Sequence, residues 1–263
     1  MADASQLPFD AVWLLHGVPN PASPGTLFAV TGARAGADDL IVGHSVSGNA
    51  GDMTIIVETR PESGHAYIQV GSPWNAGVVS GMNDVGLVVC IEQVASIEAG
   101  QREAPPLPLV LRDVLRNEGD TAGAIDRLQS VNILSGYHVL VADSGTGEAV
   151  VIAMGENASE RVPEDGLLLG VDPGSDGVDP DLAGRYARVV TLFAEERIVS
   201  VGEVQSVLLD RERGAAGSAK IFNSTTRHAV VFEPKTRTVH VAFPEADGTP
   251  GVYESITLKR GAR

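Results

Sequence analysis

The residue best placed for chemistry is Thr26, a small nucleophile that directly follows Gly25 and opens an apolar segment over 26–31. Cleavage of the Gly25–Thr26 bond would give Thr26 a free α-amino group with a pKa of about 7.7–8.0, which could deprotonate its own hydroxyl near neutral pH. No separate histidine base is then required. The pair predicts self-cleavage followed by amide chemistry, and the alternative is an ordinary strand threonine.

Other reactive groups carry weaker signals. Cys90 is the lone cysteine and lies in an apolar run over 87–91, which predicts packing in a buried strand rather than catalysis. The six histidines show no metal-ligand spacing, and the glycine-rich motifs of nucleotide sites are absent. The sequence therefore predicts no metal and no cofactor.

The elements that must position Thr26 begin with a block of strands. Short β-branched segments separated by turns predict an antiparallel sheet over 26–31, 40–44, 53–59, 65–70, 78–81 and 85–94. Helical periodicity follows over 107–115, over a segment capped by Asp120 or Thr121, over 182–193, and after the capping box that starts at Ser200. Further strands are expected over 137–142, 149–153, 227–232, 237–243 and 253–258.

This order of elements indicates an α+β protein. Two antiparallel sheets packed face to face, each covered outside by helices, would bury the apolar faces of both kinds of element. We expect a single domain over 26–263, with residues 1–25 as a propeptide or an N-terminal flap. The segment over 172–181 is rich in glycine, proline and aspartate, so it either borders a site or merely connects two elements.

With these elements placed, the chain resembles the N-terminal nucleophile (Ntn) hydrolases that act on linear amides, including penicillin acyltransferase, choloylglycine hydrolase and phospholipase-B-like proteins. Their motifs have counterparts in Gly25-Thr26, in Gly43-His44-Ser45, in the segment 81–87, in Gly184-Arg185-Tyr186 and in the segment 230–234. The resemblance runs from about residue 24 to 258, and the segment Gly-Met-Asn-Asp-Val-Gly-Leu over 81–87 is its most distinctive part. It implies a four-layer αββα sandwich.

The chain also departs from the family pattern. The family's nucleophilic cysteine falls on Gly25, its following acid on Ser47 and the arginine of its second motif on His44. A later family asparagine falls on Val171 or Asp172. Three explanations stay open: a divergent active subfamily with a shifted nucleophile, a degenerate member without catalysis, or a cysteine-to-glycine change that traps the uncut precursor.

The resemblance implies roles for four further residues. Asn83 would donate its side-chain amide to the oxyanion of the tetrahedral intermediate, although an asparagine between two strands also suits a turn. His44 and Arg185 would bind a substrate carboxylate or carbonyl, and Asp172 would border the substrate. The alternatives are a hydrogen-bonded structural histidine and a solvated arginine on a helix.

Composition limits the partners. A net charge of −15 repels nucleic-acid phosphates and anionic lipid surfaces, and no run of eighteen apolar residues predicts a membrane span. Without a basic segment before the short apolar run at 11–15, the default expectation is the cytoplasm. We predict an amide hydrolase or acyltransferase for a small-molecule amide or acyl substrate. The alternative is a degenerate protein that binds a ligand or assembles, and a homo-oligomer is compatible with either.

Overall fold

A computed structural model describes residues 25–48, 53–73, 75–94, 105–131, 136–154, 159–174, 178–195, 197–212 and 220–260. The propeptide or flap was predicted over residues 1–25, and residues 1–24 of it lie outside this set. The strands of the first half are β1 (Thr26–Thr31), β2 (Leu40–Ser47), β3 (Ile55–Thr59), β4 (Tyr67–Gly71), β5 (Ser80–Asn83) and β6 (Leu87–Gln93). A 3-10 helix, η1 (Gly32–Asp38), joins β1 to β2.

The second half alternates helices and strands. The helices are α3 (Leu107–Asn117), α4 (Thr121–Gln129), α5 (Pro180–Phe193) and α6 (Val201–Leu208). The strands are β7 (Tyr137–Asp143), β8 (Ala149–Ala153), β9 (Ser159–Arg161), β10 (Leu167–Leu169), β11 (Thr226–Glu233), β12 (Thr238–Ala242) and β13 (Glu254–Thr257). None of the helices in the described part of the chain has the length and hydrophobicity needed to cross a membrane.

The strands form two antiparallel sheets. Sheet A has the order β10-β1-β2-β11-β12-β13, and sheet B runs in chain order from β3 to β9. Strand β1 therefore lies inside sheet A, where its neighbours are β10 and β2. Because β1 is hydrogen-bonded on both sides, the position of Thr26 is set by its register with Ser45 of β2.

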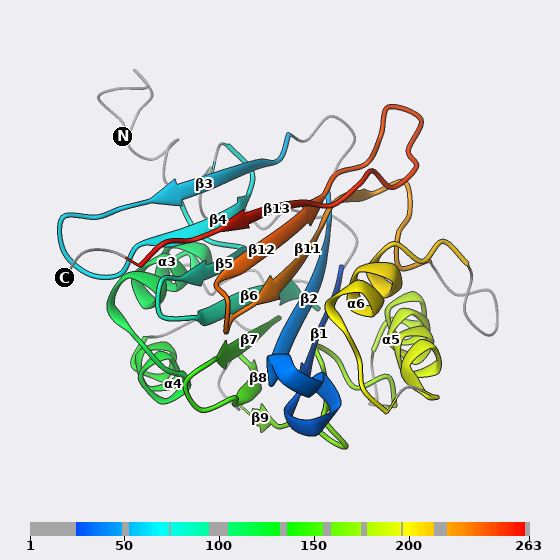
Figure 1. The fold of residues 1–263 in the computed structure, drawn as a ribbon, viewed down its shortest axis with the longest axis horizontal. Coiled ribbons are helices and arrows are strands. Elements are labelled where there is room, and N and C mark those ends of the chain that lie inside the picture. The colour runs from blue at the N-terminus through cyan, green and yellow to red at the C-terminus, as the bar shows by residue number, and fades with distance from the viewer. Residues whose placement is uncertain are drawn as a thin grey trace.

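The two sheets and the helices outside them form four layers (Figure 1), and three apolar interfaces hold these layers together. The central interface joins the inner faces of the two sheets and includes Leu27, Val42, Met82 and Phe232. Helices α3 and α4 cover the outer face of sheet B, and α5 and α6 cover that of sheet A. The alternation of side chains along a strand fills both interfaces of a sheet at once, so central strands such as β1, β6 and β8 are apolar at most positions.

The predicted αββα sandwich is confirmed. β1 and β8 have the predicted bounds, and most other predicted strands and helices differ by a few residues at their ends. Strands β9 and β10 and helix η1 were not predicted. The two strands have three residues each, too few for a periodic pattern, and they exist because they pair with the sheet edges at β8 and β1.

Candidate active site

Thr26 lies at the first position of β1 and is fully buried. It shares a face of the strand with Phe28 and Val30, which pack against the α5 and α6 side of sheet A. Its hydroxyl has no hydrogen-bond partner among the described residues. An unpaired buried hydroxyl is uncommon and costs about 1–3 kcal/mol, so this oxygen is the polar atom at the start of β1 that most needs an explanation.

Gly25 is adapted to the absence of a side chain. A Cβ atom at this position would lie 1.9 Å from the carbonyl oxygen of Ser45, which is far inside van der Waals contact. The carbonyl oxygen of Gly25 accepts a hydrogen bond of 3.4 Å from Nη1 of Arg185, a buried side chain of α5. The structure thus brings two predicted site residues, Thr26 and Arg185, to the same peptide bond.

A buried carboxyl group that sequence reasoning missed lies next to this bond. Glu92 of β6 accepts a hydrogen bond from the hydroxyl of Tyr186, which in turn accepts one from the backbone N–H of Leu27 at 3.0 Å. The other carboxyl oxygen of Glu92 has no partner among the described residues. Glu92, Tyr186 and Arg185 therefore form a polar cluster, the Glu92 cluster, around the first residues of β1.

Burial controls the charge of the Glu92 cluster. It raises the pKa of Glu92 to about 7, although the hydrogen bond from Tyr186 and the charge of Arg185 act in the opposite direction. Burial also lowers the pKa of Arg185, which the charge of Glu92 partly restores, and raises that of Tyr186. Near neutral pH the Glu92 carboxyl group can therefore exchange a proton, as general acid–base catalysis requires.

His44 lies on the strand next to β1 and faces the interior of the sandwich. It pairs with Leu27 across the two strands, and its Nδ1 lies 2.8 Å from the hydroxyl of Ser80. Burial, together with the neighbouring His228, lowers the pKa of His44 to about 3, so the ring is neutral. His228 is also buried, and neither of its ring nitrogens has a partner among the described residues. The binding of a substrate by His44 stays a prediction.

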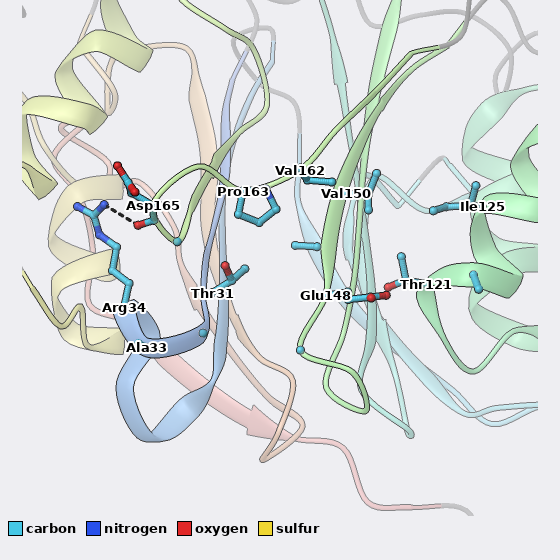
Figure 2. A pocket seen from close by; sticks show the side chains of 15 residues that line it. Thr31, Ala33, Arg34, Thr121, Ile125, Glu148, Val150, Val162, Pro163 and Asp165 are labelled. Carbon is cyan, nitrogen blue, oxygen red and sulfur yellow. Dashed lines mark hydrogen bonds between the residues drawn. The ribbon is translucent and has the colours of Figure 1, made fainter.

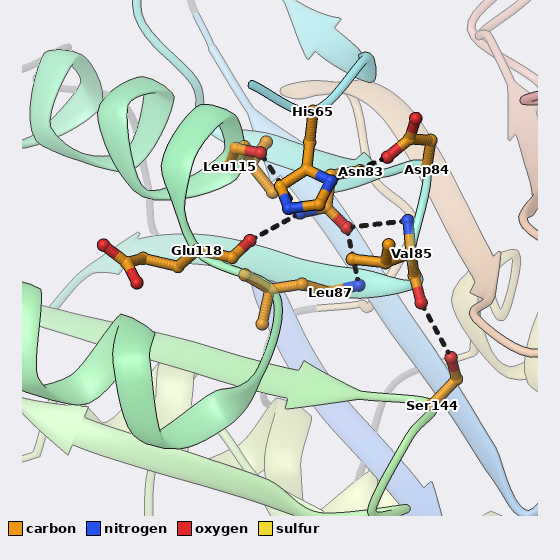
Figure 3. Close-up of polar contacts among 8 residues, drawn as sticks. All are labelled: His65, Asn83, Asp84, Val85, Leu87, Leu115, Glu118 and Ser144. Carbon is orange, nitrogen blue, oxygen red and sulfur yellow. Dashed lines mark hydrogen bonds and ion pairs between the residues drawn. The ribbon is translucent and has the colours of Figure 1, made fainter. Parts of the chain in front are cut away.

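Asn83 holds a turn together (Figure 3). Its amide nitrogen donates to the carbonyls of Leu115 at 3.1 Å and Glu118 at 2.9 Å, and its amide oxygen accepts from the N–H groups of Val85 and Leu87. Both amide hydrogens are thus engaged by the end of α3. A substrate oxyanion would have to displace one of these bonds, and the oxyanion role of Asn83 stays a prediction.

The faces of the strands separate Asn83 from the Glu92 cluster. Met82 belongs to the central core, so its neighbour Asn83 projects toward the helices on the outer face of sheet B. Glu92 projects from the inner face, because its Tyr186 partner also contacts β1 of the facing sheet. The structure therefore does not bring Asn83 to the start of β1.

Asp172 follows β10 and lines a cavity of about 560 Å³ together with Arg161. Its Oδ1 accepts a hydrogen bond from the N–H of Gly174 at 2.8 Å. The nearby Gly170 donates its N–H to the carbonyl of Leu27, and its own carbonyl accepts from Arg161 and from His138. This network connects the Asp172 segment to β1, but a contact of Asp172 with substrate stays a prediction.

Sequence spacing gave no signal for the pairing of Glu92 with Tyr186, because 94 positions separate the two residues. A charged residue at the end of the otherwise apolar β6 segment was the one available hint. Among the described residues, no group of three or more histidine, cysteine, aspartate or glutamate side chains could hold a metal ion.

Two facing antiparallel sheets with outer helices on both make up the fold, and the Gly-Thr pair stands at the start of the inner strand β1. A family model of acyl-coenzyme A:6-aminopenicillanic acid acyl-transferase matches residues 46–166. No curated protein sequence matches the chain. The predicted resemblance to the penicillin acyltransferase group is confirmed by this match and by the solved structures with the same fold.

One similar structure is the Caenorhabditis elegans ortholog of N-acylethanolamine-hydrolyzing acid amidase, with a TM-score of 0.63 and 17% identity over 80% of this chain and 93% of that chain. The C2A mutant of conjugated bile acid hydrolase from Clostridium perfringens has a TM-score of 0.58 and 12% identity, covering 88% and 92%. Penicillin V acylase from Agrobacterium tumefaciens has a TM-score of 0.55 and 12% identity, covering 83% and 82%. At these identities the likeness establishes the fold.

Proposed function

We propose that this chain is an Ntn-type amide hydrolase or acyltransferase whose chemistry starts at the Gly25–Thr26 peptide bond. One observation carries the proposal: the carbonyl of Gly25 accepts a hydrogen bond from buried Arg185, while the hydroxyl of Thr26 has no partner among the described residues. A polarised carbonyl next to an unpaired hydroxyl is the arrangement that internal acyl transfer requires. The family match and the solved amide hydrolases support the same class.

The proposed first reaction is cleavage of the chain. The Thr26 oxygen attacks the Gly25 carbonyl carbon, the C–N bond breaks, and the hydroxyl proton moves to the released nitrogen, which leaves an ester. Arg185 stabilises the negative charge on the carbonyl oxygen. Water then hydrolyses the ester, so Thr26 becomes an N-terminal residue with a free amine and a free hydroxyl. The Glu92 cluster provides a carboxyl group that can exchange a proton near neutral pH.

The second reaction acts on a linear amide. The free amine of Thr26 takes the hydroxyl proton, the oxygen attacks the amide carbon, and the substrate amine leaves with a proton as the acyl group is held on Thr26. Water or a second amine then releases the acyl group. Thr26 is fully buried beside the uncut bond, so the proposal requires that cleavage precede the entry of substrate.

The mass of the purified chain tests the cleavage. We expect a fragment that begins at Thr26, and we expect Thr26→Ala to stay at the full mass of 27.4 kDa. Thr26→Ser keeps the hydroxyl and serves as the matched control that still cleaves. The cleaved protein should then release the fluorophore from an N-acyl aminocoumarin, a linear amide. A chain that stays uncut and forms no acyl adduct on Thr26 contradicts the proposal.

A second candidate is a binding protein that has the fold but no nucleophile. It is favoured by Gly25, since the Cβ of any side chain at this position would overlap the carbonyl oxygen of Ser45. If this candidate is right, Gly25→Cys neither cleaves nor gains activity and loses several kcal/mol of stability through the overlap. Gly71→Ala is the matched control, because nothing lies within 4 Å of its added Cβ. Cleavage in the Gly25→Cys variant would instead support the first candidate.

A further inference from the structure

A separate cavity of about 680 Å³ lies at the opposite end of β1 from Gly25 (Figure 2). It is bounded by the end of β1 and the start of η1, by the first turns of α4, by the β7–β8 turn, and by the connection between β9 and β10. Its distance from the Gly25–Thr26 bond is about 17 Å, because a strand of six residues advances about 3.4 Å per residue. The cavity is therefore separate from the proposed reaction site.

The walls of this cavity are mostly apolar. Thr31 and Pro163 lie on one side, and Val150 and Ile125 lie on the facing side (Figure 2). Val162 also lines the cavity and is 65% exposed. It therefore offers apolar surface that a ligand could cover. Cavities of about 300–1,000 Å³ with such walls are the size that small-molecule ligands occupy.

The charged residues that line the cavity are Glu148, Asp165 and Arg34, so carboxylates outnumber cations there and favour a cationic ligand. The backbone of Glu148 is hydrogen-bonded, but its carboxylate forms no hydrogen bond or ion pair with any residue in the described part of the chain. The guanidinium group of Arg34 is already held, because it donates to the carbonyls of Asp165 at 3.2 Å and Phe193 at 2.6 Å. With a net charge of −15 on the whole chain, an anion would be repelled from this cavity and an ammonium group attracted.

We propose that this cavity binds a small primary amine with an apolar body. The ammonium group pairs with Glu148, and the apolar body packs between Val150 and Pro163. The hydroxyl of Thr121 is already donated to Asp143 at 2.9 Å, so in this proposal the carboxylate of Glu148 supplies the charge that selects the ligand. This inference does not depend on the function proposed for Thr26, since none of the site residues described above lines the cavity.

Titration calorimetry with 2-phenylethylamine tests the proposal. The matched probes are 2-phenylethanol, which lacks the charge, and 3-phenylpropionate, which reverses it. We expect the amine to bind and both control probes to bind at least about tenfold more weakly. Absence of amine binding at about 10 mM, or equal binding of all three probes, would overturn the proposal.

Two variants locate the site. Glu148→Gln should weaken amine binding about three- to tenfold, and Ala122→Phe, which adds a ring to an exposed position of α4 lining the cavity, should abolish it. Glu62→Gln, at an exposed position of the β3–β4 loop, is the control that should bind as the natural chain does. Amine binding that Glu148→Gln retains unchanged would overturn the proposal. Glu148 is exposed, so its variant decides the outcome even where Ala122→Phe fails to fold.

Discussion

At the scale of single residues, Glu92 is a carboxyl group buried between the two sheets. A carboxyl group on the inner face of a sheet would normally be excluded from an apolar core, because burial disfavours its charge. Here Tyr186 donates a hydrogen bond to it and Arg185 lies close enough to stabilise its anion. Burial outweighs both of these interactions, so the pKa of Glu92 is still raised to about 7.

This pKa predicts a pH dependence of stability. The native state keeps the proton on Glu92 up to about pH 7, whereas the unfolded chain loses it near the ordinary value of 4.5. The contribution of Glu92 to the free energy of unfolding is therefore fully present below pH 4.5, falls as the pH rises toward 7, and is then lost. Relative to Glu92→Gln, the loss should be on the order of 3 kcal/mol.

Urea unfolding of both proteins between pH 4 and 8 measures this difference. The free energy of the natural chain should fall relative to that of Glu92→Gln across the interval and level off above it. Glu62→Gln, which changes an exposed carboxylate, should follow the natural chain throughout. Parallel curves for Glu92→Gln and the natural chain would show that the buried carboxyl group does not hold its proton.

At the scale of elements, the β5–β6 turn explains why the segment 81–87 is so distinctive. Gly86 adopts a φ of 92°, which suits glycine, and its N–H donates to the carbonyl of Asn83. The side chain of Asn83 then joins this turn to the end of α3 through two hydrogen bonds and accepts two more from Val85 and Leu87 of the turn itself. The motif is thus explained by local structure before any catalytic role is added.

Substitution of Asn83 separates the structural role from the catalytic one. Asn83→Ala leaves two carbonyls and two N–H groups without their partner, so we expect a loss of about 3 kcal/mol or more. Asn83→Asp should be at least as destabilising, because its carboxylate would face the carbonyls of Leu115 and Glu118. Asn117→Ala, an exposed change on α3, should cost at most about 0.5 kcal/mol.

Thermal unfolding of these variants is the measurement. A purely catalytic Asn83 would give variants as stable as the natural chain but without amide hydrolysis. Such a result would contradict a role of the Asn83 side chain in holding the β5–β6 turn to α3.

At the scale of the whole molecule, the two sheets share the central apolar interface, and a second apolar interface joins sheet B to its helices. Phe232 lies in the central interface, and Leu111 lies between sheet B and its helices. If residues 26–263 form a single domain, as we predict, damage to either interface must destabilise the whole sandwich.

Two truncations test this cooperativity. Phe232→Ala should lower the free energy of unfolding by about 3–5 kcal/mol, and Leu111→Ala should lower it by about 2–5 kcal/mol. In both variants, unfolding followed by far-UV circular dichroism should coincide with unfolding followed by tyrosine and tryptophan fluorescence. Exposed Val252→Ala is the control and should change little. Separate transitions for the two probes would contradict a single domain.

The sequence alone predicted all the described helices except η1 and all the described strands except β9 and β10, and the order of these elements indicated the fold class. Local periodicity and turn residues carry that information, because they depend on neighbours along the chain. For the same reason the capping box was predicted at Ser200, where the structure has it.

Only the tertiary structure decided what each site residue faces. Whether Asn83 points to a helix or to the sandwich interior depends on which face of sheet B is covered, and the burial of Thr26 depends on the packing of the layers. The Glu92–Tyr186 pair and the approach of Arg185 to Gly25 join residues 94 and 160 positions apart. Such contacts follow from the stacking of layers, which no local pattern encodes.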